Sequence, residues 1–465
     1  MTEPQVDFKW RSPAAFIIVT VGATLSLNDF LTFPVLAGQN GGGVFLLLYI
    51  LFLFIMGLPL LMAELLMGRL GGRDPSSCFN EVAARYKASV YWKLVGISTL
   101  IAAILIIATL SVVAGWSLAY FFKSVLGVYN GVTPEVADTL FNNFLLDGER
   151  MALWFTLFIL IVTTICAQPI KLGLERFNLV VVPLMCLLLF ICLLPGMISA
   201  EFSNSVRFLL YADFSAFDAQ TPILALRRAF YTLVIAVGVM MAFGRYIPAG
   251  TSIGYSAAMV ITIDFLVSIF TGLAINSLVL SAGYQPVLDN QFAFRTLPVI
   301  FAQFGLGQWY AAAFYALIGL AATTTVIALM ESPINYLMRK YRYSRLKAAI
   351  VTAIIIWLFG LGIVLGYSIW SGEGITLALY FGDKAVRLVN NAGFQDVLIF
   401  ISNYLIQPVA ALFICIFVAW IVPREISHGH FSSAGKYRFE VWNFLIRYVT
   451  PTLLFIVILS SLGIL

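Results

Sequence analysis

Five charged side chains stand inside or at the edge of long apolar runs in this 465-residue sequence. They are Asp29, Glu64, Arg228, Asp264 and Glu331. An ionisable group in an apolar medium is costly unless it is paired or faces a cavity. Each one alone is also consistent with a hydrogen-bonded anchor between helices. Together they indicate a polar interior inside an apolar protein.

Hydroxyl groups add to this interior in a run of three threonines, Thr323, Thr324 and Thr325. Threonine in a helix commonly bonds its own backbone, so the run alone favours a local role over ion binding. Two histidines, His428 and His430, lie in a polar loop, and the five cysteines form no CxxC or Cys/His pattern. With no nucleophile–base pair apparent, the sequence predicts neither an enzyme nor a cysteine- or histidine-based metal site.

The composition indicates which class of protein must position these groups. Apolar residues make up 61% and charged residues 11%, and the mean hydropathy is +0.98. Soluble domains carry about a quarter charged residues, so the chain is predicted to be a polytopic membrane protein. Most soluble enzymes, nucleic-acid modules and secreted scaffolds are excluded. The net charge of +5 is spread over short loops, which predicts no nucleic-acid partner. The polar start MTEPQVDFKWR predicts no signal peptide.

Eleven apolar stretches are long enough to cross a bilayer as helices, which takes about 20 residues each. Their length and continuity favour helices over the short alternating strands of a barrel. The predicted spans are 13–37, 43–68, 94–122, 151–168, 178–198, 229–246, 252–282, 308–338, 348–370, 397–422 and 441–465.

The distribution of Lys and Arg predicts the orientation. With the N-terminus inside, 18 of these residues flank the spans on the cytoplasmic side and 8 on the outer side. Cytoplasmic loops are enriched in Lys and Arg. We therefore expect an integral protein of the inner (cell) membrane with a cytoplasmic N-terminus and an outer C-terminus.

Two of the predicted spans contain interruptions. The first reads TVGATLSLNDF (Thr20–Phe30), and the sixth reads TLVIAVGVMMAFG (Thr232–Gly244). They open two successive five-span blocks, and matching interruptions in two halves point to a transporter's central site. The small residues of the sixth span, taken alone, are more typical of close helix packing. The adjacent Asn28 and Asp29 make that interpretation poor for the first span.

Several segments resemble one known family over essentially the whole chain. They are FLTFPVLAGQNGGG (Phe30–Gly43), GLPLLMAELLMGR (Gly57–Arg69), AFYTL, TGLAI (Thr271–Ile275) and ATTTVIALME (Ala322–Glu331). They resemble the neurotransmitter:sodium symporter family, which includes the bacterial leucine transporter. The resemblance implies an all-α fold of eleven transmembrane helices with a five-plus-five inverted repeat and broken helices 1 and 6. It also implies a single transmembrane domain, with repeats near 10–200 and 223–422 and an extra helix near 438–465.

The resemblance further implies two sodium sites at the breaks. One would use backbone carbonyls and the hydroxyls of the threonine run. Its implied ligands are Gly22, Leu25, Ala321, Thr324 and Thr325. Five neutral oxygens suit a hard monovalent cation. A possible second sodium would use Thr24, Asp29, Thr232 and Asp264.

The second site departs from the family pattern. The family usually has asparagine where Asp29 stands and glutamine where Arg228 stands. Two carboxylates around one monovalent ion are over-charged unless one is protonated or a cation is near, and Arg228 could supply that charge. Chloride-coupled members hold their anion near the positions of Tyr49 and Ser268. We hypothesise that the fixed carboxylates replace chloride, so that chloride is not required.

Most of the implied substrate-lining positions are apolar. They are Ala23, Ser26, Leu27, Asn28, Ile106, Leu110, Tyr231, Val234, Val237, Thr325 and Leu329. Amino-acid members usually carry a tyrosine at the position of Leu110, and amine members carry an aspartate at that of Ser26. Backbone N–H groups at the break could still bind a carboxylate.

The gates and supports also depart from the family. At the outer gate, Thr32 stands where the family has an arginine. At the inner gate the family pairs an arginine near the N-terminus with an aspartate at the end of the eighth span. Here those positions are Asp7 and Arg339, with Tyr246 nearby, so the signs of the two charges are exchanged. Glu64 is implied to brace the broken backbone of the sixth span.

The sequence therefore predicts a sodium-coupled symporter that works by alternating access on a small organic solute. An amino acid with an apolar side chain is the first choice. A non-standard or cationic solute that meets Asp29, and a transport-silent sensor or binding subunit, are the alternatives. A channel is disfavoured by the apolar pocket. The sequence leaves the oligomeric state open.

Overall fold

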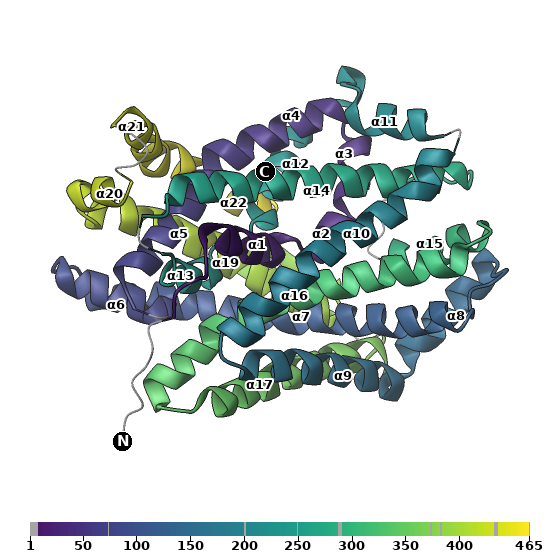
Figure 1. Cartoon of the computed structure of the whole chain (residues 1–465), viewed down its shortest axis with the longest axis horizontal. Coiled ribbons are helices and arrows are strands. Elements are labelled where there is room, and N and C mark those ends of the chain that lie inside the picture. Colours follow the sequence, from purple (N-terminus) through teal and green to yellow (C-terminus); the bar gives the residue numbers. More distant parts are fainter. Residues whose placement is uncertain are drawn as a thin grey trace.

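The computed structural model describes residues 8–72, 74–199, 201–248, 250–286, 291–372, 374–381, 384–431 and 436–464. The fold is a bundle of long helices running in roughly the same direction (Figure 1). Nine of the described helices are long and apolar enough to cross a membrane without a break. They are Gly43–Leu70, Val90–Val125, Gly148–Ala167, Lys171–Ile198, Ile253–Ser281, Gly307–Tyr341, Arg345–Tyr367, Phe394–Ile421 and Tyr437–Ser461.

These nine helices match nine of the predicted spans, and the other two predicted spans are the interrupted ones. Several of the nine contain π-helical turns. The α-helical parts are α4 (Gly43–Phe52), α5 (Leu58–Leu70), α7 (Lys93–Val125), α9 (Gly148–Ala167), α10 (Arg176–Ile198), α14 (Ile253–Ser281), α16 (Gly307–Tyr341), α17 (Arg345–Tyr367), α18 (Phe394–Ile399), α19 (Gln407–Ile416), α21 (Lys436–Phe444) and α22 (Thr450–Ser461). The π turns are Leu53–Gly57, Lys171–Glu175, Phe400–Ile406, Phe417–Ile421 and Leu445–Val449.

The first crossing is broken where the polar residues predicted a break. Helix α1 (Pro13–Thr24) begins after Ser12, whose hydroxyl accepts the N–H of Ala15 at 3.1 Å. It ends because Leu25 leaves the helical region with ψ of 93°. The chain resumes as α2 (Leu27–Leu31) and α3 (Phe33–Gln39). Leu25 and Ser26 therefore lie outside any helix, and their backbone polar groups are not all engaged in helical hydrogen bonds.

The sixth crossing is broken over a longer stretch. Helix α12 (Gln220–Thr232) ends at Leu233, and α13 (Val239–Gly244) begins after Gly238. Between them the backbone φ is positive at Val234 (50°), Ala236 (60°) and Gly238 (82°). A positive φ is strained for a β-branched residue, so surrounding contacts must hold this segment. Helix α12 begins nine residues before the predicted start at 229, because Arg227 and Arg228 lower the hydropathy of its outer half.

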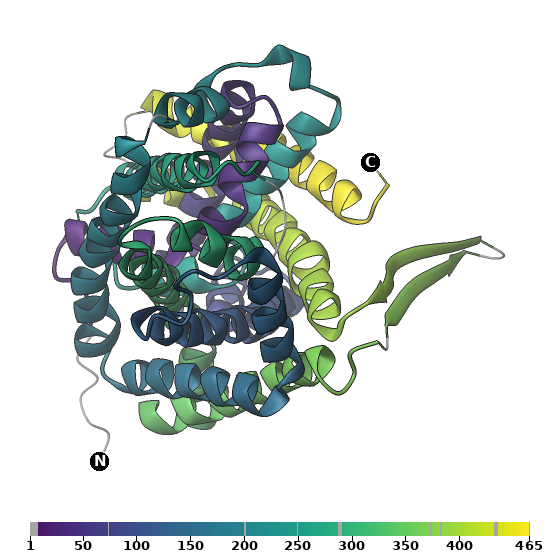
Figure 2. The same ribbon diagram turned by 90° about the vertical axis from the view of Figure 1, so that its right-hand side faces the viewer.

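Short elements cap the two ends of the bundle. Helices α6 (Pro75–Arg85) and α20 (Arg424–His430) lie at one end, and α8 (Pro134–Leu146), α11 (Phe202–Leu210) and α15 (Phe292–Ala302) lie at the other (Figure 1). Strands β1 (Ile375–Phe381) and β2 (Lys384–Ala392) form an antiparallel hairpin, which projects away from the helices (Figure 2). The predicted spans left this hairpin as a loop. Two short 3₁₀ turns, Val90–Trp92 and Phe214–Ala216, complete the elements.

Candidate functional site

The broken first crossing meets the threonine run of α16. The Thr325 hydroxyl donates to the Leu25 carbonyl at 3.0 Å, across 300 residues of sequence. The Thr324 hydroxyl donates to the Ala321 carbonyl at 2.9 Å, and all four residues are buried. Hydroxyl and carbonyl oxygens of the first implied sodium site therefore converge. Thr323 instead bonds Gly319 of its own helix at 2.8 Å.

The remaining implied ligand of this site, Gly22, lies against α10. A Cβ at Gly22 would lie 2.2 Å from Oδ1 of Asn178. The amide nitrogen of Asn178 donates to Leu174 at 2.8 Å, while its buried Oδ1 has no hydrogen-bond partner in the described part of the chain. The close approach requires glycine. It also leaves an oxygen available beside the carbonyl and hydroxyl cluster.

A buried charge cluster lies at the possible second sodium site. The Oδ2 atom of Asp29 accepts the N–H and the hydroxyl of Ser26 at 2.7 and 3.0 Å. Its Oδ1 accepts the hydroxyl of Thr232 at 2.8 Å and a guanidinium N–H of Arg228. The side chain of Asp29 is 0% exposed and that of Arg228 is 7% exposed. The two charges are thus paired away from water.

Asp264 completes this cluster but is poorly satisfied. Its Oδ2 is 3.4 Å from the Thr232 hydroxyl, and Thr24 also lies beside it. Its Oδ1 is buried without a hydrogen-bond partner among the described residues, as are the hydroxyls of Tyr49 and Ser268. The structure therefore brings together Thr24, Asp29, Thr232 and Asp264, with two acids and one arginine in the same buried space.

Two side chains hold the broken segment of the sixth crossing. Glu64, on α5, accepts the backbone N–H of Ala236, which has a positive φ. Gln407, at the start of α19, donates to the carbonyl of Ile235 at 2.8 Å. Both side chains are buried. The sequence pointed to Glu64 but missed Gln407, whose signal is a single amide before Pro408 in an apolar run.

The implied substrate-lining positions come from α1, α2, α7, α16 and the sixth crossing. Seven are buried: Ala23, Ser26, Leu27, Val234, Val237, Thr325 and Leu329. Ile106, Leu110 and Tyr231 are partly buried. Asn28 lies in α2, with its side chain outside the described part. The Tyr231 hydroxyl donates to the Asn403 carbonyl at 3.1 Å and lies 3.3 Å from the Ser461 hydroxyl.

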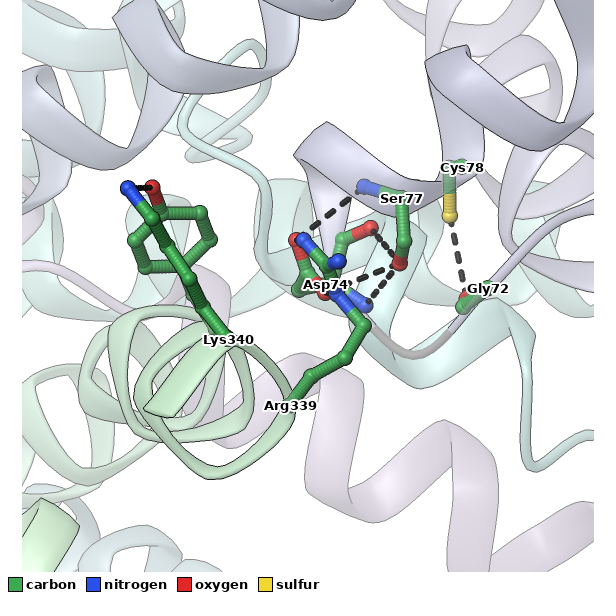
Figure 3. Close-up of polar contacts among 7 residues, drawn as sticks. Gly72, Asp74, Ser77, Cys78, Arg339 and Lys340 are labelled. Carbon is green, nitrogen blue, oxygen red and sulfur yellow. Dashed lines mark hydrogen bonds and ion pairs between the residues drawn. The ribbon is translucent and has the colours of Figure 1, made fainter. Parts of the chain in front are cut away.

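The predicted gate residues lie in separate parts of the fold. Thr32 lies between α2 and α3. Asp7 is outside the described residues, so its pairing with Arg339 stays a prediction. Arg339 contacts Asp74, with Nε–Oδ2 at 2.5 Å and Nη2–Oδ1 at 3.3 Å (Figure 3). Asp74 also caps α6 by accepting the Ser77 N–H at 3.1 Å. An Asp-Pro start of a helix was the available sequence signal for this residue.

The N-terminal segment is joined to the end of the sixth crossing. The Trp10 N–H donates to the Tyr246 carbonyl at 3.0 Å, and its indole N–H donates to the Phe243 carbonyl at 3.2 Å. The rings of Phe8 and Tyr246 lie 5.2 Å apart. Aromatic packing therefore ties the N-terminal segment to the end of α13, while the Arg339–Asp74 pair ties the end of α16 to the start of α6.

The chain is similar to known membrane transporters in sequence and in fold. A family model described as the sodium:neurotransmitter symporter family matches residues 8–130. An uncharacterized sodium-dependent transporter of Bacillus subtilis is 28% identical over 99% of both chains. Another, of Haemophilus influenzae, is 25% identical over 97% of this chain and 98% of that one. A crystal structure of MhsT in complex with L-phenylalanine superposes with a TM-score of 0.84 and 27% identity, covering 98% of this chain and 99% of that chain.

These matches support the predicted resemblance to the sodium:neurotransmitter symporter family. The structural match confirms the predicted fold class, with eleven crossings in a five-plus-five inverted repeat and broken helices 1 and 6. The protein is an integral membrane transporter and not an enzyme. The repeat boundaries near 10–200 and 223–422 and the extra helix near 438–465 stay predictions.

Proposed function

We propose that this chain is a sodium-driven symporter for a small amino acid with an apolar side chain, working by alternating access. The observation that carries the proposal is the Thr325–Leu25 contact, which joins the break of the first crossing to α16. The relatives from Bacillus subtilis and Haemophilus influenzae are named sodium-dependent transporters. MhsT was crystallised with L-phenylalanine.

The residues at this contact fit a sodium ion. The carbonyls of Gly22, Leu25 and Ala321 and the hydroxyls of Thr324 and Thr325 would hold it. Hard cations prefer oxygen ligands, and these five are neutral. Bound sodium would supply a positive charge that attracts oxygens from both α1 and α16. The two helices belong to different repeats, so the site can favour one relative arrangement of the repeats over another.

The buried environment supports an amino acid over a cationic solute. The carboxylate that a cationic solute was expected to meet, Asp29, already accepts hydrogen bonds from Arg228, Thr232 and Ser26. The implied lining is mostly aliphatic and buried, which suits an apolar side chain. The broken backbone segments provide polar groups for the amino and carboxyl groups of the solute.

The proposed cycle closes the cytoplasmic face through two contacts. One is the Arg339–Asp74 ion pair, and the other is the packing of Phe8 and Trp10 on Tyr246. This assignment takes the N-terminus as cytoplasmic and the C-terminus as outer, as the 18 to 8 distribution of Lys and Arg favours. Opening towards the cytoplasm would then require both contacts to separate.

Transport assays in proteoliposomes test the proposal. We expect uptake of a radiolabelled apolar amino acid from a panel when an inward sodium gradient is present, and none with choline. Thr325→Val removes the hydroxyl that reaches Leu25, and we expect half-maximal uptake to need about tenfold more sodium, or about 1.4 kcal/mol. Thr323→Val is the matched control, because its hydroxyl bonds only its own helix.

The assay also separates the competing functions. Sodium-dependent binding of an amino acid without uptake would indicate a sensor or binding subunit. Uptake that is unaffected by replacing sodium would contradict the proposal. Equal effects of Thr325→Val and Thr323→Val would show that the cross-helix contact has no special role in sodium dependence.

A further inference from the structure

The hydrogen-bonding capacity of Asp29 is fully used within the protein. An ionised carboxylate offers about four lone-pair positions. Two donors from Ser26 reach Oδ2, and Thr232 and Arg228 reach Oδ1. No lone pair of Asp29 remains for a cation. The carboxylate expected to hold a second sodium therefore already has four donors, one of them a guanidinium.

The guanidinium of Arg228 cannot easily leave this position. Its side chain is 7% exposed and packs with its charged group 5.2 Å from the centre of the Phe33 ring. Arginine stays protonated in proteins. A sodium ion at Asp29 would have to displace a buried cation and leave it without its partner, which is strongly unfavourable. Asp29 itself therefore does not fit a sodium ion. The other implied ligands, Thr24, Thr232 and Asp264, lie in the same buried space as the Arg228 guanidinium, whose fixed positive charge opposes a second cation there.

We propose that Arg228 is the built-in cation of this site, so that the transporter binds a single sodium ion, between α1 and α16. The inference rests on the proposed sodium-driven symport and concerns the number of ions. The two sites differ in the source of their positive charge, which is a protein side chain at one and a bound sodium ion at the other. Asp29 is neutralised by a residue on α12, whereas the oxygens of Leu25, Thr324 and Thr325 are neutral and have no arginine or lysine among their hydrogen-bond partners in the described chain.

Direct measurement of bound sodium tests this proposal. Purified wild-type protein is titrated with ²²Na⁺ in a scintillation proximity assay calibrated to protein amount. We expect one bound ion per chain and a Hill coefficient of about 1, since a Hill coefficient cannot exceed the number of sites. The variant Thr324→Val/Thr325→Val removes both hydroxyls, and we expect it to lose sodium binding.

The decisive variant is Asp29→Asn/Arg228→Gln. It replaces Asp29 by an amide of equal size and Arg228 by a shorter amide, so neither member of the pair is left as a lone buried charge. We expect it to bind two sodium ions per chain, because the two introduced amides leave carbonyl oxygens available beside Asp264. Arg228→Lys, which keeps the cation, is the matched control and should still bind one. Size-exclusion chromatography confirms that each variant is folded.

The possible outcomes separate this inference from the proposed function. Two ions bound to the wild-type protein would overturn the inference alone and leave sodium-driven symport standing. No bound sodium in the wild-type protein would overturn both. A double variant that is folded and still binds one ion would show that Arg228 does not exclude the second.

Discussion

The ion pair between Arg339 and Asp74 gives a sharp prediction about the cytoplasmic closure. Asp74 is fully buried, while the Arg339 side chain is 42% exposed. A hydrogen bond to a charged group contributes about 1.5–3 kcal/mol, and exposed pairs contribute less than about 1 kcal/mol. For this half-exposed pair we expect about 1.5 kcal/mol. Its loss should shift the closed–open equilibrium by about tenfold.

Cys78 reports this opening. It lies one turn into α6, and its thiol is buried and contacts the Gly72 carbonyl at 3.1 Å (Figure 3). Burial raises the pKa of the Cys78 thiol well above its usual range. Because the thiolate is the reactive form, a maleimide should react slowly in the closed state. Opening would expose the thiol, lower its pKa towards the usual value and speed the reaction.

The assay follows alkylation of Cys78 in membranes, with the other four cysteines replaced by serine or alanine. Arg339→Gln breaks the pair without touching the cap of α6. Asp74→Asn removes the charge but keeps an N-cap acceptor, since asparagine caps helices well. We expect both to raise the alkylation rate about tenfold if reaction follows the open population.

The neighbouring Lys340 supplies the control. Its ammonium bonds the Tyr336 hydroxyl at 2.8 Å and lies away from Asp74 (Figure 3). Lys340→Gln removes an equal charge from the same helix end and should leave the rate unchanged. If Lys340→Gln accelerates alkylation as much as Arg339→Gln, the pair has no specific role. If neither changes it, the Arg339–Asp74 contact does not hold the face closed.

Three further predictions concern the breaks and the ions. Gly22→Ala should lower the free energy of unfolding by about 1–3 kcal/mol, because the added methyl overpacks against Asn178, and it should weaken ²²Na⁺ binding. Gly319→Ala, whose Cβ would lie 3.9 Å from the nearest atom, should change neither. Equal sodium binding by the two variants would contradict the close-packed site. Glu64→Gln should insert normally but transport more slowly, because a neutral amide accepts the Ala236 N–H less strongly than a carboxylate; undiminished uptake would count against the brace. Replacing chloride with gluconate should leave uptake unchanged, because Asp29 and Asp264 are fixed carboxylates that we expect to take the place of the anion; loss of uptake would reject chloride independence.

The sequence was sufficient for the crossings and for the places where two of them break. Long apolar runs report membrane spans directly, because the bilayer sets their length. The Asn28–Asp29 pair and the small residues near Gly238 predicted the two breaks. The start of the sixth crossing was predicted nine residues late, because charged Arg227 and Arg228 lie within a helix.

Which polar groups meet was decided only by the tertiary structure. Asp29 pairs with Arg228 from 199 residues away, and Arg339 pairs with Asp74 from 265 residues away. Hydropathy reports how each segment meets lipid, but it contains no information on which helix faces which. Direct contact between two charges depends on helix packing and on rotamers. For that reason the sequence could suggest a charge near Asp29, whereas only the folded chain shows that all four acceptor positions of Asp29 are filled.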